Sequence, residues 1–159
     1  MILYIYILKI LIKENTNITK LKDIAERFAG KIQKGNVVLF EGELGAGKTT
    51  FTRFLINSIF EKESLKKPYS IKSPSFPIMI SYQLKNFQIF HYDFYRLENN
   101  NELAELNIFE NIKNNISIIE WPKKLIKYKD IENYYLIKIK ILNSFMRAIE
   151  ISNSNKKIF

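Results

Sequence analysis

The sequence predicts an α/β fold of the three-layer sandwich type, in which helices cover both faces of a sheet that mixes parallel and antiparallel strands. The first observation is the apolar run 36–42 (NVVLFEG), which is typical of a strand buried on both faces of a parallel sheet. The second is two pairs of extended runs, 78–84 with 87–97 and 134–142 with 145–152, each of which predicts an antiparallel hairpin.

The remaining elements follow from local patterns. The opening run 1–12 is rich in β-branched and aromatic residues and predicts a strand. Asn17 can cap a helix that Gly30 or Gly35 would end. The apolar positions of that helix fall close to a 3.6-residue period, at Leu21, Ile24, Ala25, Phe28 and Ile32.

A second helix is predicted after the glycine-rich loop. One helical face collects positions spaced i, i+3, i+4, i+7 and i+8, namely Phe51, Phe54, Leu55, Ser58 and Ile59. Residues 99–114 favour one or two short helices, and 117–121 (SIIEW) favours a buried strand.

Length and composition indicate one folded domain over residues 1–159, with 47% hydrophobic and 26% charged residues. No apolar stretch approaches the length of a membrane-spanning helix, so we expect no membrane association. The absence of cysteine suits a reducing compartment, and we expect a cytoplasmic protein. The formal net charge of +9 could attract RNA or acidic partners, or could reflect a compositional bias toward lysine, asparagine and isoleucine.

Three of the five glycines lie in residues 42–50, which read GELGAGKTT. This stretch matches the phosphate-binding loop pattern and stands between a strand and a helix, as that motif requires. Glycines let the main chain bend closely around an anion, and the following helix adds free N–H groups. We expect Lys48 to contact the β and γ phosphates and the Thr49 hydroxyl to bind Mg²⁺. The other loop residues should contact ATP, with the Glu43 side chain pointing outward. The loop residues are Gly42, Glu43, Leu44, Gly45, Ala46, Gly47, Lys48, Thr49 and Thr50.

Nucleotide hydrolysis also requires a carboxylate for Mg²⁺ and a group that positions the attacking water. Asp93 and Glu120 each stand at the end of an apolar run. Together with Lys48 they are the candidate catalytic residues. Together with Thr49 they form the candidate metal site. The alternatives are a turn or cap for Asp93 and a surface pair with Lys123 or Lys124 for Glu120.

Three further features have both functional and structural interpretations. His91 is the only histidine, and we expect it to have a structural or loop-orienting role. Arg96 could neutralise phosphate charge, or pair with Glu98 or Glu102 on the surface. The serines flanking Pro74 could hold a loop that senses the γ-phosphate, or bond to local backbone in a proline turn.

Four blocks in order, GELGAGKTTFTR, SPSF, HYDFYRL and IIEWP, resemble the TsaE (YjeE) family of small ATPases in tRNA threonylcarbamoyladenosine biosynthesis. The resemblance runs from about residue 19 to residue 141, and the last two blocks make it specific. It implies a P-loop ATPase that assists a TsaD-type threonylcarbamoyl transferase and its TsaB-type paralogue. The resemblance also implies that those proteins modify the adenosine beside the anticodon of ANN-reading tRNAs, and that ATP hydrolysis turns the complex over. Contact with tRNA could come through that complex or from the chain itself, and the sequence does not distinguish the two.

By position, the resemblance implies Mg²⁺ association for Asp93, hydrolysis for Glu120, and a place beside the nucleotide for Trp121. Residues 73–76 match the family's switch loop, with Ser75 where threonine is usual. Many members also carry an arginine soon after the Glu-Trp-Pro stretch, where this chain has lysines at 123 and 124.

Two other functions use the same loop. A small-molecule kinase would need an acceptor pocket and an arginine-rich lid, which the sequence does not show. A nucleotide-sensing module would bind ATP without hydrolysis, and the joint presence of Thr49, Asp93 and Glu120 argues against it. No Asn-Lys-x-Asp stretch is present to read guanine, so we expect ATP rather than GTP.

Overall fold

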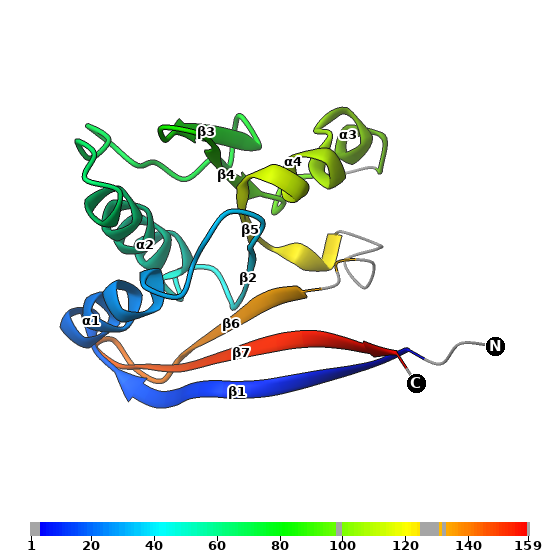
Figure 1. Cartoon of the computed structure of the whole chain (residues 1–159). Coiled ribbons are helices and arrows are strands. Elements are labelled where there is room, and N and C mark those ends of the chain that lie inside the picture. Colours follow the sequence, from blue (N-terminus) through cyan, green and yellow to red (C-terminus); the bar gives the residue numbers. More distant parts are fainter. Residues whose placement is uncertain (1–3, 98–99, 125–130, 132, 159) are drawn as a thin grey trace.

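The computed structural model describes residues 4–97, 100–124, 131 and 133–158. Figure 1 shows a curved sheet with helices packed on both of its faces. No helix in those ranges is long and apolar enough to cross a membrane. The elements are β1 (Tyr4–Thr16), α1 (Ile18–Ala29), β2 (Val37–Glu41), α2 (Lys48–Lys62), β3 (Met79–Gln83), β4 (Gln88–Asp93), α3 (Asn100–Glu105), α4 (Ile108–Asn114), β5 (Ile116–Glu120), a 3-10 turn η1 (Pro122–Lys124), β6 (Asn133–Ile141) and β7 (Arg147–Ile158).

The seven strands form one sheet in the order β1-β7-β6-β2-β5-β4-β3. The central strands β6, β2, β5 and β4 run parallel, while β3, β7 and β1 join as antiparallel neighbours. The predicted mixed α/β sheet is therefore confirmed, with β3–β4 and β6–β7 as the two predicted hairpins. Since β2, β5 and β4 are parallel, their carboxyl ends meet at one edge of the sheet.

Alternating residues of the central strands face two separate apolar clusters. Val38 and Phe40 of β2 pack in the cluster that contains α1 and α2, whereas Val37 and Leu39 pack in the cluster that contains Ile108 of α4. Burial on both faces explains the continuous apolar sequence of β2. The arrangement gives three layers, with α1 and α2 on one face and α3 and α4 on the other (Figure 1).

Aromatic contacts fasten α1 to its neighbours. The Phe28 ring lies 6.3 Å from the Phe51 ring of α2 and 5.0 Å, edge to face, from the Tyr135 ring of β6. Such pairs contribute about 0.5–1.5 kcal/mol beyond their buried area. The predicted cap is present, because the Asn17 side chain accepts from the Lys20 amide at 3.0 Å. The helix ends at Gly30, so Ile32 is buried beyond it and not within it.

Some predicted boundaries differ from the observed ones. The first strand was expected to end at residue 12 and runs to Thr16, because it pairs with β7 down to Thr16 opposite Arg147. The same pairing extends β7 to Ile158, past the predicted end at residue 152. Strand β4 ends at Asp93, and the following residues form a turn, which places the Asp93 side chain at the end of the strand.

Candidate functional site

The loop between β2 and α2 has the backbone conformation that its glycines were expected to permit. Gly42 and Gly47 have φ angles of 153° and 108°. A Cβ on Gly42 would lie 2.4 Å from the Ile139 carbonyl oxygen of β6, so a side chain would collide with main chain there. Gly47 is the N-cap of α2 and leaves the first amides of that helix without capping side chains. The loop therefore offers main-chain N–H groups to an anion.

Arg147 supports this loop from the neighbouring hairpin. Its Nε donates to the Ala46 carbonyl at 3.1 Å, and its Nη1 donates to the carbonyls of Asn143 and Met146 at 2.7 and 3.0 Å. The guanidinium thus ties the β6–β7 turn to a loop 101 residues away. The sequence alone assigns no role to Arg147; its only signal is a position just after the predicted turn.

Lys48 is buried at the first position of α2, with 4% of the residue exposed. Its Nζ donates to the carbonyls of Gly42 and Glu43 at 2.8 and 2.9 Å and lies 4.0 Å from the centroid of the Trp121 ring. Burial lowers the pKa of Lys48, and the charges of Glu120 and two other carboxylates partly oppose that shift. Glu43 is exposed, as predicted, so its carboxylate contributes from outside the loop.

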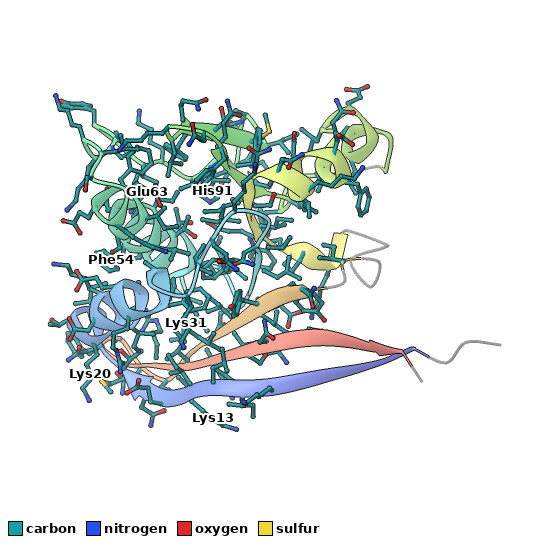
Figure 2. The ribbon with its side chains drawn as sticks, viewed as in Figure 1. Lys13, Lys20, Lys31, Phe54, Glu63 and His91 are labelled. Atoms are coloured by element: carbon teal, nitrogen blue, oxygen red, sulfur yellow. The ribbon has the colours of Figure 1, made fainter. Side chains whose placement is uncertain are left out.

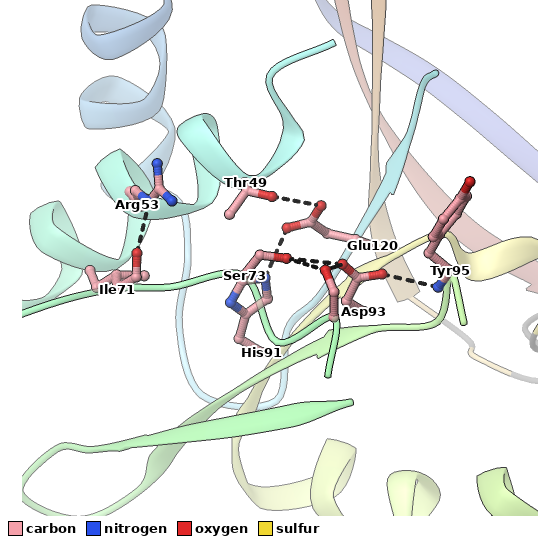
Figure 3. A network of polar contacts seen from close by, with 9 residues as sticks. Thr49, Arg53, Ile71, Ser73, His91, Asp93, Tyr95 and Glu120 are labelled. Carbon is pink, nitrogen blue, oxygen red and sulfur yellow. Dashed lines mark hydrogen bonds and ion pairs between the residues drawn. The ribbon is translucent and has the colours of Figure 1, made fainter. Parts of the chain in front are cut away.

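Glu120 ends β5 with only 2% of the residue exposed. Its Oε2 accepts from the Thr49 hydroxyl at 3.1 Å, and its Oε1 lies 2.9 Å from His91 Nε2 (Figure 3). The alternative of a surface pair with a nearby lysine is wrong, because the carboxylate is buried and faces α2.

Asp93 lies beside Glu120, since the two are register partners on β4 and β5. Its Oδ2 accepts from the hydroxyls of Ser73 and Ser75 at 3.1 and 2.8 Å, and its Oδ1 accepts from the Tyr95 amide at 3.0 Å (Figure 3). Asp93 therefore caps a turn, which was the structural alternative for this residue, and it also holds the loop that carries Ser73 and Ser75. Both serine side chains bond to this carboxylate, which corrects the alternative in which they bond only to local backbone.

Two aromatic rings lie over the site. The Trp121 and Tyr95 rings have centroids 4.9 Å apart. Trp121 has a φ of 59°, a conformation that is uncommon for a residue with a bulky side chain. Its amide donates to the Phe40 carbonyl at 3.3 Å, which anchors the strained residue to β2. The ring therefore lies where the β2 and β5 strand ends meet, against the ammonium of Lys48.

A cavity of about 200 Å³ collects these groups at the amino end of α2. It is lined by Leu44, Gly45, Gly47, Lys48, Thr49, Thr50, Ser73, Ser75, Asp93, Tyr95, Glu120 and Trp121. The structure thus brings together the predicted lysine, threonine, both carboxylates, Ser75 and Trp121. Gly42, Glu43 and Ala46 shape the loop but do not line this cavity.

A second cavity, of about 410 Å³, lies on the other side of the loop and shares Gly45, Gly47 and Thr50 with the first. Ile18 and Phe145, 59% and 83% exposed, give it apolar walls. No local sequence motif marks this cavity, because its walls come from the start of α1 and the β6–β7 turn. A third cavity, of about 820 Å³, lies beside the site against β1, β6 and β7. Its walls do not include Lys48, Thr49 or Asp93, so we assign the candidate site to the smaller cavity.

Arg96 and Lys123 do not line the candidate cavity. The Arg96 guanidinium stacks over the exposed Phe76 ring, 4.3 Å from its centroid, instead of entering the cavity. Glu98, one of its predicted partners, lies outside the described residues. Lys123 lines the third cavity, and the side chain of Lys124 is not described.

The oxygen ligands available here suit a hard cation that keeps water and phosphate ligands. Within the described ranges, no group of three or more His, Cys, Asp or Glu side chains could hold a metal ion. Mg²⁺ is usually bound through one or two protein carboxylates plus substrate phosphates, so this donor set fits it.

Fold and loop together define a P-loop protein: a glycine loop joins a buried parallel strand to a helix, and two carboxylates from neighbouring strand ends face its lysine. A family model described as "Threonylcarbamoyl adenosine biosynthesis protein TsaE" matches residues 15–149. The chain belongs to the TsaE family, which confirms the resemblance of its four sequence blocks.

Curated relatives agree with this assignment. A protein of Rickettsia typhi named "tRNA threonylcarbamoyladenosine biosynthesis protein TsaE" is 34% identical over 84% of this chain and 89% of its own length. One of the same name from Aquifex aeolicus is 29% identical over 80% of this chain and 85% of its own length. The crystal structure of YdiB from Bacillus subtilis superposes with a TM-score of 0.66 at 27% identity, covering 92% of this chain and 86% of that one.

Proposed function

We propose that this protein is a Mg²⁺-dependent ATPase required for the threonylcarbamoyladenosine modification of tRNA. One observation carries the proposal: Lys48, Thr49, Asp93 and Glu120 line a single cavity at the amino end of α2. A P-loop that only binds nucleotide has no need of a second buried carboxylate beside the first. The pathway comes from the names of the relatives and of the family model.

Phosphate binding would begin with Lys48. Its ammonium has two carbonyl partners and lies against the Trp121 ring. An incoming triphosphate would offer the ammonium a more negative partner, and the free amides at the start of α2 would bind the same phosphates. If Lys48 moves from its carbonyl partners toward the phosphates, its ammonium also moves away from the ring of Trp121.

Thr49 and Asp93 would hold Mg²⁺, which supplies positive charge to the β and γ phosphates. The Thr49 hydroxyl oxygen can bind a cation while its hydrogen continues to donate to Glu120. Ser73 and Ser75 donate to Asp93 Oδ2, so the loop that carries these serines is tied to the proposed Mg²⁺ ligand.

Glu120 would bind and orient the attacking water. Its Oε1 is held by His91 on the inner side, which leaves Oε2, now bonded to Thr49, as the oxygen that can face a water molecule. A buried carboxylate at that position can orient the water and accept its proton. No arginine lines the cavity among the described residues, so intrinsic turnover should be slow. We propose that a TsaD-type transferase and its TsaB-type paralogue complete the site.

The adenosine part of ATP would occupy the second cavity. Gly47 and Thr50 line both cavities, so the second cavity adjoins the phosphate cavity at the start of α2. Phe145 offers a ring for stacking against the base and Ile18 an apolar contact.

The test is ATP hydrolysis by the purified full chain, measured as phosphate release with and without the partner proteins. Lys48→Ala and Glu120→Gln should each lower the rate at least about 100-fold, because each removes a charge that acts on the transition state. Lys113→Ala and Glu110→Gln are matched controls, since those residues form an exposed pair on α4. Equal rates in the site variants and the controls would reject the ATPase and leave a nucleotide-sensing module.

A further inference from the structure

His91 is a buried polar residue that the proposed mechanism does not yet use. It is fully buried on β4, with Ile80 and Ile118 as its register neighbours on β3 and β5. Figure 2 shows it inside the molecule, whereas side chains such as Lys13 and Lys20 lie at the periphery. A polar ring in such a position needs a hydrogen-bond partner, and its observed partner is Glu120.

The hydrogen-bond inventory of the ring indicates which nitrogen carries the hydrogen. Nε2 lies 2.9 Å from Glu120 Oε1, and Nδ1 has no partner among the described residues. A carboxylate only accepts, so Nε2 must donate. A hydrogen on Nδ1 as well would be buried without an acceptor, which costs more than leaving a lone pair there. The neutral ring with its hydrogen on Nε2 therefore fits the surroundings.

This single donor distinguishes the two oxygens of Glu120. Oε1 points inward to His91, and Oε2 points outward to Thr49 in the cavity. Figure 3 shows the carboxylate between the two side chains. Without His91 the carboxylate would lose its inner partner, and Oε2 would no longer be held in one direction.

We propose that His91 is a positioning residue for ATP hydrolysis, acting only through Glu120 to direct Oε2 at the attacking water. This inference rests on the proposed ATPase function. It assigns His91 a constant donor role and no proton transfer. It predicts that loss of the donor affects the hydrolytic step and leaves nucleotide binding intact, because His91 does not line the cavity.

The experiment compares variants of the full chain for single-turnover phosphate release and for ATP affinity. His91→Phe keeps a ring of similar size without the donor and should slow hydrolysis about 10–100-fold, as is usual for residues that orient a reacting ligand. His91→Gln can place an amide N–H near the position of Nε2 and should recover most of the rate. ATP affinity should stay within about 2-fold of the parent in both variants, because neither touches the phosphate contacts.

Tyr92→Phe is the matched control. It removes a partly buried hydrogen bond, which Asn111 donates to the Tyr92 hydroxyl at 2.9 Å, on the opposite face of the same strand. It should lower stability without changing the hydrolysis rate. If His91→Phe behaves like Tyr92→Phe, with the rate unchanged, His91 is structural and the inference is overturned. If His91→Phe does not fold, His91→Asn replaces it, because its shorter amide falls short of Glu120 and should be slow where His91→Gln is fast.

A double-mutant cycle separates action through Glu120 from independent action. In a Glu120→Gln background, His91→Phe should cause no further loss. A further loss of the same factor as in the parent would overturn the inference. Absence of phosphate release by the parent protein with its partners would instead reject the ATPase itself, and the positioning role with it.

Discussion

Substitution of Gly42 by alanine tests whether β6 and the phosphate loop are as closely packed as the structure indicates. Two costs combine at this position. A non-glycine residue at a φ of 153° is strained by about 1–3 kcal/mol. The new Cβ would also lie 2.4 Å from the Ile139 carbonyl oxygen, and main chain must shift to relieve the overlap, at a further cost of about 1–3 kcal/mol. We expect a loss of about 2–6 kcal/mol in the free energy of unfolding.

Gly45→Ala provides the control within the same loop. Gly45 has a φ of 77°, but its Cβ would meet nothing within 4 Å. Only the backbone strain applies, so the loss should be about 1–3 kcal/mol. The difference between the two variants isolates the overlap with β6.

Urea unfolding monitored by circular dichroism measures both losses, and an unchanged m-value shows that the variants differ from the parent in stability alone. A total stability of about 5–15 kcal/mol, typical of a domain, leaves room to measure the milder variant. Equal stabilities for Gly42→Ala and Gly45→Ala would refute the close approach of the loop to β6. A Gly42→Ala protein as stable as the parent would refute the strained backbone as well.

Three further predictions concern the same site. Arg147→Met should lower the free energy of unfolding by about 1.5–3 kcal/mol and weaken ATP binding, because the Ala46 carbonyl loses a charged donor; unchanged ATP affinity by calorimetry would contradict its support of the loop. Burial lowers the pKa of Lys48 in the folded protein below the 10.5 of the unfolded chain. Between these two pKa values the unfolded state binds more protons, so the free energy of unfolding should rise with pH there. Urea unfolding of the parent should show this rise and Lys48→Met should lack it, whereas the same dependence on pH in both proteins would contradict the lowered pKa. ATP with Mg²⁺ should change the fluorescence of Trp121, the only tryptophan, because the ammonium 4.0 Å from its ring would move; an unchanged spectrum at saturating ATP would contradict that movement.

Much of the fold could be predicted from local patterns. The Asn17 cap, the end of α1 at Gly30 and both hairpins appear where the sequence indicates them. The ends of β1 and β7 could not be predicted, because polar residues extend these strands by pairing across the sheet, Asn15 with Ala148 and Asn153 with Lys9, and not through an apolar pattern. Strand length here depends on a partner that is far away in the sequence.

The site shows the same division between local and distant information. The loop 42–50 is recognisable because an anion-binding turn needs glycines, a lysine and a hydroxyl at fixed spacing along one stretch of chain. Asp93 and Glu120 could be chosen as candidates because each ends an apolar run. That they lie side by side depends on the register of β4 with β5, which no local pattern encodes.

The sequence by itself determined the phosphate loop, the alternation of strands and helices, and the identity of the acidic candidates. The tertiary structure alone decided that His91 bonds Glu120, that two serines hold Asp93, and that Arg147 reaches the Ala46 carbonyl. The physical reason is how far apart in the sequence the interacting residues lie. Backbone conformation and amphipathic period are set by residues a few positions apart, whereas a hydrogen bond between distant side chains depends on strand order and register, which the whole core sets together.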